Sequence, residues 1–281
     1  NTTHTSGGET QFSRGYGTGI PGSFVDDVTY STIEINNSSG DGQWATPSNW
    51  ALGSVPSSTT NVTISSGQTI EVGSTETSTA AVANNLTIES GGSLTIAKNS
   101  DLTLSGNFTN NGTVTLNSES DEFSSIIVGG SSTGDIIYNR YVNTVGDGEW
   151  DLIGSPVDGL SINDFVTTNS SVLATNGSAY AVGYHDNTDD SWTNYTTSTV
   201  GGAGNFDTSR GYQMATSSGA TMAFTGSIAT TDQTQSIINN NGNGNGGRRW
   251  NLVANPFPSY LNANTNAHAS NNFLSVNASV I

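Results

Sequence analysis

The chain has 281 residues, which is long enough for two domains of ordinary size. Six Lys and Arg stand against 23 Asp and Glu, giving a formal net charge of −17. This balance argues against nucleic acid as a partner, because binding to a phosphate backbone depends on cationic contacts. There is no Cys, so neither disulfides nor thiolate metal sites can hold the fold.

Ser, Thr, Asn and Gly dominate the sequence, and only 10% of residues are charged. Ser, Thr and Asn side chains compete with helical backbone hydrogen bonds, and Gly adds an entropic cost, so the composition predicts an all-β protein. No apolar run approaches the roughly 18 to 20 residues that span a bilayer, so we expect no membrane span. Residues 1–6 lack the cationic start and apolar stretch of a signal peptide, so we expect it to have been removed.

The first 40 residues contain closely spaced Gly and one Pro, which are typical of loops. The stretch Phe24–Tyr30 then alternates apolar residues around two aspartates, and it resembles the closing strand of jelly-roll modules found in bacterial polysaccharide-acting proteins. We therefore interpret residues 1–40 as a linker or as the tail of a preceding β-domain.

Between residues 41 and 141, a short phrase with Thr between two apolar residues recurs. Each copy places two apolar side chains on one face of a strand and the Thr on the other. The copies are Val62-Thr63-Ile64, Leu86-Thr87-Ile88, Leu94-Thr95-Ile96, Leu102-Thr103-Leu104 and Val114-Thr115-Leu116.

Three of these triplets, at Leu86, Leu94 and Leu102, recur every 8 residues, with turn-forming Gly and Asn between them. Short strands with regular turns and one apolar face predict a parallel β-solenoid, in which coils stack and the Thr and Asn positions form ladders. The alternative is an antiparallel meander, because Asn111-Gly112 is also typical of a hairpin turn.

Residues 142–281 contain a second kind of repeat, in which Trp150–Pro156 returns as Trp250–Pro256 after 100 residues. We interpret this region as a β-sandwich with an internal duplication, in which Trp150 and Trp250 anchor the core. The first copy continues into two strands around an Asp- and Asn-rich turn, whereas the second stops before any such hairpin. We therefore expect the domain to be truncated at its C-terminus.

The acidic turn supplies the best candidate for an ion site. Asp186, Asn187, Asp189 and Asp190 offer the hard oxygen ligands that Ca²⁺ prefers, so Ca²⁺ is the one cofactor that the sequence suggests. The alternative is that these side chains only cap the backbone of a hairpin turn.

Sugar binding requires exposed aromatic platforms, and four aromatic residues lie at or beside turns. We take Trp44, Trp50, Trp192 and Tyr195 as candidate ligand-binding residues, with packing in the core as the alternative. No catalytic set emerges: His4, His185 and His268 lie far apart, and the neighbouring acids Asp189 and Asp190 would face opposite sides of a strand.

The segments Gly42–Trp50 and Gly53–Pro56, followed by the strands at Asn61–Ile64 and Asn85–Ile88, resemble large surface and secreted proteins of Bacteroidetes. The phrase Asn255–Ser259 is similar to segments of the same proteins. Together these matches cover residues 41–281. The resemblance implies export by the type IX secretion system and a role as an adhesin or a polysaccharide-handling protein.

Three functions follow as hypotheses. The first is a non-catalytic extracellular structural and adhesive segment of a larger surface protein, which contacts polysaccharide or other cell-surface components. The second is a carbohydrate-binding module of a secreted polysaccharide-degrading enzyme. The third, a fragment of a hydrolase or lyase, ranks last because no acid, base or nucleophile set is visible.

Overall fold

The computed structural model describes residues 2–6, 9–13, 35–146, 150–238 and 250–261. The chain divides into two compact units, residues 1–32 and residues 33–281. In the first unit, β1 (Thr2–Ser6) pairs antiparallel with β2 (Glu9–Ser13). The interpreted strand at Phe24–Tyr30 lies outside the described residues.

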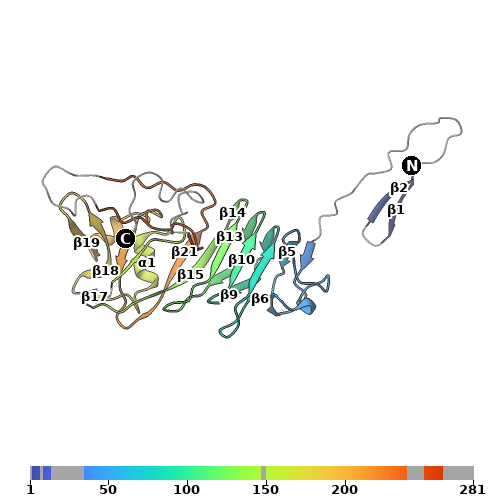
Figure 1. Cartoon of the computed structure of the whole chain (residues 1–281), viewed down its shortest axis with the longest axis horizontal. Helices are drawn as coiled ribbons and strands as arrows, with labels where there is room; N and C mark the ends of the chain where they lie inside the picture. The colour runs from blue at the N-terminus through green and yellow to red at the C-terminus, as the bar shows by residue number, and fades with distance from the viewer. Residues whose placement is uncertain (1, 7–8, 14–34, 147–149, 239–249, 262–281) are drawn as a thin grey trace, which may run out of the picture. The chain divides into compact units, whose positions relative to one another are not determined.

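The second unit begins with a parallel β-solenoid of about four turns, which confirms the predicted solenoid and excludes the meander (Figure 1). Its strands form three sheets, one along each side of the coil. The first is β13 (Ser125–Val128), β10 (Asp101–Leu104) and β7 (Ala80–Ala83). The second is β14 (Ser132–Thr133), β11 (Phe108–Asn110), β8 (Leu86–Ile88), β5 (Asn61–Ile64) and β3 (Ile35–Asn37). The third is β21 (Ala220–Ser227), β15 (Asp135–Val142), β12 (Thr113–Leu116), β9 (Ser93–Ile96), β6 (Thr69–Val72) and β4 (Gly42–Gln43).

The 8-residue repeat is the length of one side of a coil. Leu86, Leu94 and Leu102 lie on three successive sides, and all three side chains are fully buried in one interior. A full coil takes 22 to 24 residues, because Leu86 pairs with Val62 on one neighbouring coil and with Phe108 on the other. The Asn111-Gly112 turn therefore joins two sides of one coil and makes no hairpin.

Polar ladders run along the outside of the stack, as predicted. Thr63, Thr87, Thr109 and Thr133 lie in register on four successive coils. At a corner, the Asn61 Oδ1 accepts a hydrogen bond from the Asn85 Nδ2 at 2.7 Å, and the Asn85 Oδ1 accepts one from the Asn107 backbone N–H at 2.6 Å. These bonds satisfy side-chain and backbone groups that the tight corners leave unpaired.

At the N-terminal end of the solenoid, a loop with the short 3₁₀ helix η1 (Pro47–Asn49) carries Trp44 and Trp50. At the other end, all eight residues of β15 pair antiparallel with β21. Sheet edges are prone to aberrant pairing, and β21 covers the edge that β15 would otherwise present in the third sheet.

After β15 the chain forms a lobe whose strands make a separate sheet. These strands are β16 (Asp151–Ile153), β20 (Tyr212–Met214), β18 (Ala179–Asp186), β17 (Thr175–Asn176) and β19 (Ser191–Thr196), which pairs with β18. The second, facing sheet that a sandwich requires is not confirmed in the part of the chain that the structure describes.

The lobe also contains η2 (Val200–Gly202) and one α-helix, α1 (Ile162–Thr168), which the all-β prediction omitted. Ser161 caps the N-terminus of the helix, because its Oγ accepts a hydrogen bond from the Asp164 backbone N–H at 3.0 Å. Phe165 of the helix packs on Phe206 and on Phe224 of β21, with ring centroids 5.2 and 4.7 Å apart. The lobe and the end of the solenoid therefore share one core. None of the helices in the described ranges is long and apolar enough to cross a membrane.

Candidate functional site

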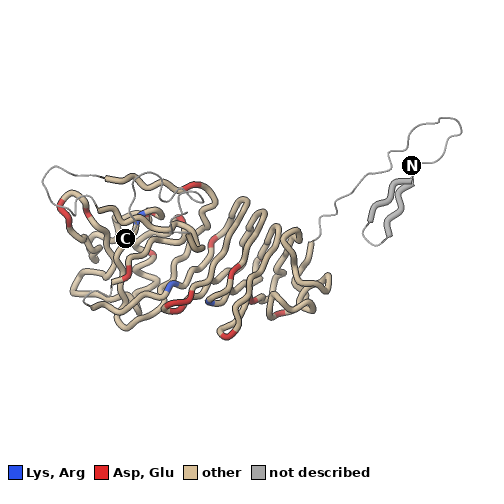
Figure 2. Tube along the Cα trace, viewed as in Figure 1, with Lys and Arg blue, Asp and Glu red and all other residues tan. Residues whose placement is uncertain are grey.

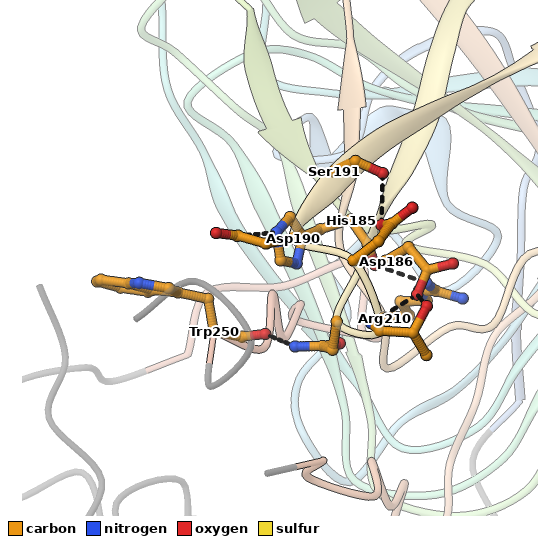
Figure 3. A network of polar contacts seen from close by, with 9 residues as sticks. His185, Asp186, Asp190, Ser191, Arg210 and Trp250 are labelled. Carbon is orange, nitrogen blue, oxygen red and sulfur yellow. Dashed lines mark hydrogen bonds and ion pairs between the residues drawn. The ribbon is translucent and has the colours of Figure 1, made fainter. Parts of the chain in front are cut away.

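The β18–β19 turn, residues Asn187–Asp190, gathers most of the side chains that the sequence singles out (Figure 3). The strands diverge after Asp186, whose carboxylate accepts hydrogen bonds from the Thr188 backbone N–H at 2.8 Å and from its Oγ1 at 2.7 Å. These bonds hold the pKa of Asp186 below its usual value. Asp190 takes a positive φ of 62°, which Asp tolerates better than most residues.

Each of the other turn residues has its own protein partner. The Asp189 carboxylate accepts a hydrogen bond from the Ser191 hydroxyl at 2.6 Å, and the Asp190 carboxylate lies 3.2 Å from the His185 Nε2. Asn187 donates to the backbone oxygen of Trp250. In the described ranges no three His, Cys, Asp or Glu residues are grouped to hold a metal ion. The turn accounts for these contacts without an ion, and Ca²⁺ binding stays a prediction.

Aromatic and cationic side chains surround this turn. Trp192 is 44% exposed, and its ring meets the His185 ring edge-on at a centroid distance of 5.4 Å. Tyr195 is half-buried against Tyr184 at 5.7 Å, and burial raises the pKa of its hydroxyl. Arg210 lies 4.3 Å above the Tyr184 ring and donates to the His185 backbone oxygen at 2.9 Å. Of the four predicted platforms, Trp192 is the one whose side chain is exposed.

The prediction that Trp250 lies in the core is wrong. Its side chain is 57% exposed, and its ring points away from the turn in Figure 3 while its backbone oxygen is held by Asn187. Trp150, its counterpart in the first copy of the duplicated phrase, is partly buried against the core, as expected. Exposed aromatic surface is therefore contributed by a residue that the sequence assigned to packing.

The prediction of sugar platforms at Trp44 and Trp50 is also wrong. Their side chains are 1% and 2% exposed, and the rings meet edge-on with centroids 4.9 Å apart. The Trp50 Nε1–H donates to the Trp44 backbone oxygen at 2.8 Å. Both indoles close the first coil of the solenoid and cannot offer a face to a ligand.

Sequence reasoning missed Arg210, Trp250 and the pairing of His185 with Asp190. A sequence signal for this pair existed: His185 and Asp190 are five residues apart, and a short hairpin brings the ends of its two strands together. The side chain of His4 and the whole of His268 lie outside the described residues.

Acidic residues are more numerous than basic ones over the described chain (Figure 2).

Comparison with known proteins adds one match: a family described as a domain of unknown function, DUF8693, matches residues 35–280. No curated protein and no solved structure matches the chain. Since the family match spans the solenoid and the lobe together, this chain belongs to the DUF8693 family.

Proposed function

We propose that this chain is a non-catalytic extracellular segment of a larger bacterial surface protein, in which the solenoid is a rigid stalk and the lobe presents an adhesive surface. The observation that carries the proposal is the position of β15. This strand pairs in parallel with β12 of the solenoid and antiparallel with β21, whose Phe224 packs on α1 of the lobe. The lobe is thereby built onto the stalk through a shared sheet and a shared core.

Stiffness follows from the way that the coils stack. Each coil is bonded to its neighbours along three sheets, and its apolar side chains lie in one continuous interior. In a solenoid, stability comes from each repeat and its contacts with adjacent repeats, so a sharp bend would strain the ladders of all three sheets at once. The extracellular location is part of the proposal and rests on the resemblance of residues 41–281 to secreted Bacteroidetes proteins.

The adhesive part of the proposal is supported by the β18–β19 turn. Trp192 and Trp250 expose 44% and 57% of their surface, and Asn187 ties Trp250 to the turn. Indole rings combine a large apolar face with a polar N–H, which suits contact with a sugar ring. The same observation favours the second candidate function, a carbohydrate-binding module of a polysaccharide-degrading enzyme.

The purified chain, coupled to beads, tests the proposal on surfaces of insoluble cellulose, chitin and xylan. We expect saturable retention on at least one surface, strong loss of retention in Trp192→Ala and Trp250→Ala, and no release of reducing ends. Leu52→Ala is the matched control, because Leu52 is 50% exposed but lies near the opposite end of the solenoid. Release of reducing ends by the wild-type chain would overturn the non-catalytic assignment. Wild-type retention in both Trp variants would overturn the adhesive role of the turn.

A further inference from the structure

A cavity of about 360 Å³ lies where the end of the solenoid meets the lobe. Phe123, Tyr138 and Arg140 line it from the solenoid side. Its other walls come from residues 152–156 and 252–260, so both copies of the duplicated Trp phrase face the same space. The volume falls in the range of small-molecule sites.

The two copies meet closely at this cavity. Both copies pair with the segment Arg210–Tyr212. Ile153 pairs antiparallel with Tyr212, and Val253 makes an antiparallel bridge with Arg210. A Cβ atom built on Gly154 would overlap the Cβ of Ala254, which occupies the equivalent position in the second copy. The duplication therefore builds one shared wall, where the sequence predicted two separate sandwich anchors.

The second copy then crosses to the solenoid as a strap over the cavity. The Pro258 backbone oxygen accepts a hydrogen bond from the Ile126 N–H at 2.8 Å, which satisfies a donor on the edge strand β13. The Tyr260 hydroxyl donates to the Phe123 backbone oxygen at 3.1 Å, while 66% of the Tyr260 surface stays exposed. This arrangement fixes an accessible aromatic ring at the mouth of the cavity.

Arg140 gives the cavity its charge. Of the three basic residues in the described chain, Lys98 pairs with Glu119 at 2.6 Å and with Glu122 at 2.8 Å, and Arg210 donates to the His185 backbone oxygen. Arg140 instead lies 3.8 Å above the Phe123 ring, and its Nη1 is buried without a hydrogen-bond partner. No described carboxylate lies within ion-pair distance of its guanidinium.

Burial also lowers the pKa of Arg140, since desolvation penalises its charged form. An arginine stays protonated in proteins, so the charge persists and is only partly balanced by the ring beneath it. Asp151, a carboxylate whose charge acts on Arg140, already accepts two hydrogen bonds from Asn143, at 2.8 and 2.9 Å. A ligand carboxylate would supply the partner that the fold leaves out.

We propose that this cavity binds the carboxylate of an acidic sugar residue, a uronate, with Arg140 contacting the anion and Tyr260 stacking on the sugar ring. A sugar is favoured over a peptide terminus because aromatic rings, which stack on sugar rings, line the cavity beside the charged group: Phe123, Tyr138 and Tyr260. This proposal rests on the glycan-contacting part of the proposed function. It assigns a second contact, separate from the β18–β19 turn.

Calorimetry with the full chain tests it, using a galacturonate trimer and its neutral methyl ester as the paired probes. We expect the acid to bind and the ester to bind about ten-fold more weakly or not at all, since one charge-assisted contact is lost. Arg140→Met should show a similar loss, and Tyr260→Ala, at an exposed position that should fold normally, should also weaken binding. Lys98→Met is the matched control and should bind like the wild type, because that cation already has carboxylate partners.

Several results would overturn the proposal: equal binding of acid and ester, full binding by folded Arg140→Met, or binding only of a peptide with a free C-terminal carboxylate. Trp192→Ala separates this site from the β18–β19 turn. If retention on a neutral polysaccharide depends on Trp192 while the uronate trimer does not bind, this inference fails and the proposed function stands. If the uronate binds in an Arg140-dependent way while bead retention does not depend on Trp192 or Trp250, the adhesive role of the turn fails and this site stands.

Discussion

Two adjacent isoleucines on β13 provide a matched test of the solenoid interior. Ile126 is 1% exposed and faces the core, whereas Ile127 is 49% exposed and faces outward. Replacing buried Ile126 with Ala removes three carbons and leaves a cavity, which should cost about 2 to 5 kcal/mol of unfolding free energy. The same change at Ile127 removes partly hydrated atoms, so we expect a cost of about 1 kcal/mol or less.

Urea denaturation followed by tryptophan fluorescence measures both variants. The buried indoles of Trp44 and Trp50 report on the first coil, far along the stack from the mutated strand. We expect the midpoint to fall much further in Ile126→Ala than in Ile127→Ala, with similar slopes in the two transitions. Equal losses, or a larger loss at Ile127, would refute the inward and outward assignment of this strand.

Two further predictions concern the junction between solenoid and lobe. Burial raises the pKa of Tyr138 to about 12 from its ordinary 10.0, so the unfolded chain loses that proton first and stability should fall from about pH 10 to about pH 12. In alkaline denaturation, Tyr138→Phe should make this fall in stability shallower. Part of the fall should remain, because burial also raises the pKa values of Tyr195 and Tyr212. An unchanged slope would contradict the assignment of the fall to Tyr138. Gly154→Ala should destabilise the protein by about 1 to 3 kcal/mol through overlap with Ala254, and Ala254→Gly should restore much of the loss in the double variant, measured by thermal unfolding. Additive effects of the two changes would refute direct contact between the phrase copies.

The solenoid was predictable because its strands carry a short pattern whose physical meaning is local. In Leu86-Thr87-Ile88 the alternation alone places two side chains inward and the Thr outward, and the structure confirms this. The strands that were missed break the pattern at the inward positions. Strand β7 turns small Ala81 and Ala83 inward and exposes Val82, and β11 buries Asn110, whose Nδ2 donates to the Asp135 backbone oxygen.

The candidate site was less predictable, because exposure of an aromatic side chain depends on tertiary contacts. Trp50 is buried with its ring against Trp44, whereas the Trp250 ring stays exposed although Asn187, 63 residues earlier, holds the Trp250 backbone oxygen. Neither contact produces a periodic pattern in the sequence. Arg140 is a similar case: the sequence does not reveal that its charge has no described carboxylate partner, since that depends on three separate segments converging at one cavity.

The most direct test of the stacked-coil account is a distance along the outer Thr ladder. The chain has no Cys, so Thr63→Cys with Thr133→Cys gives two specific spin-label positions. Because these residues lie three coils apart in register, electron paramagnetic resonance should report about 14 Å between backbones, three strand spacings of about 4.8 Å. A meander of the same strands would separate them by nine spacings, roughly 43 Å, and a distance near that value would contradict the account.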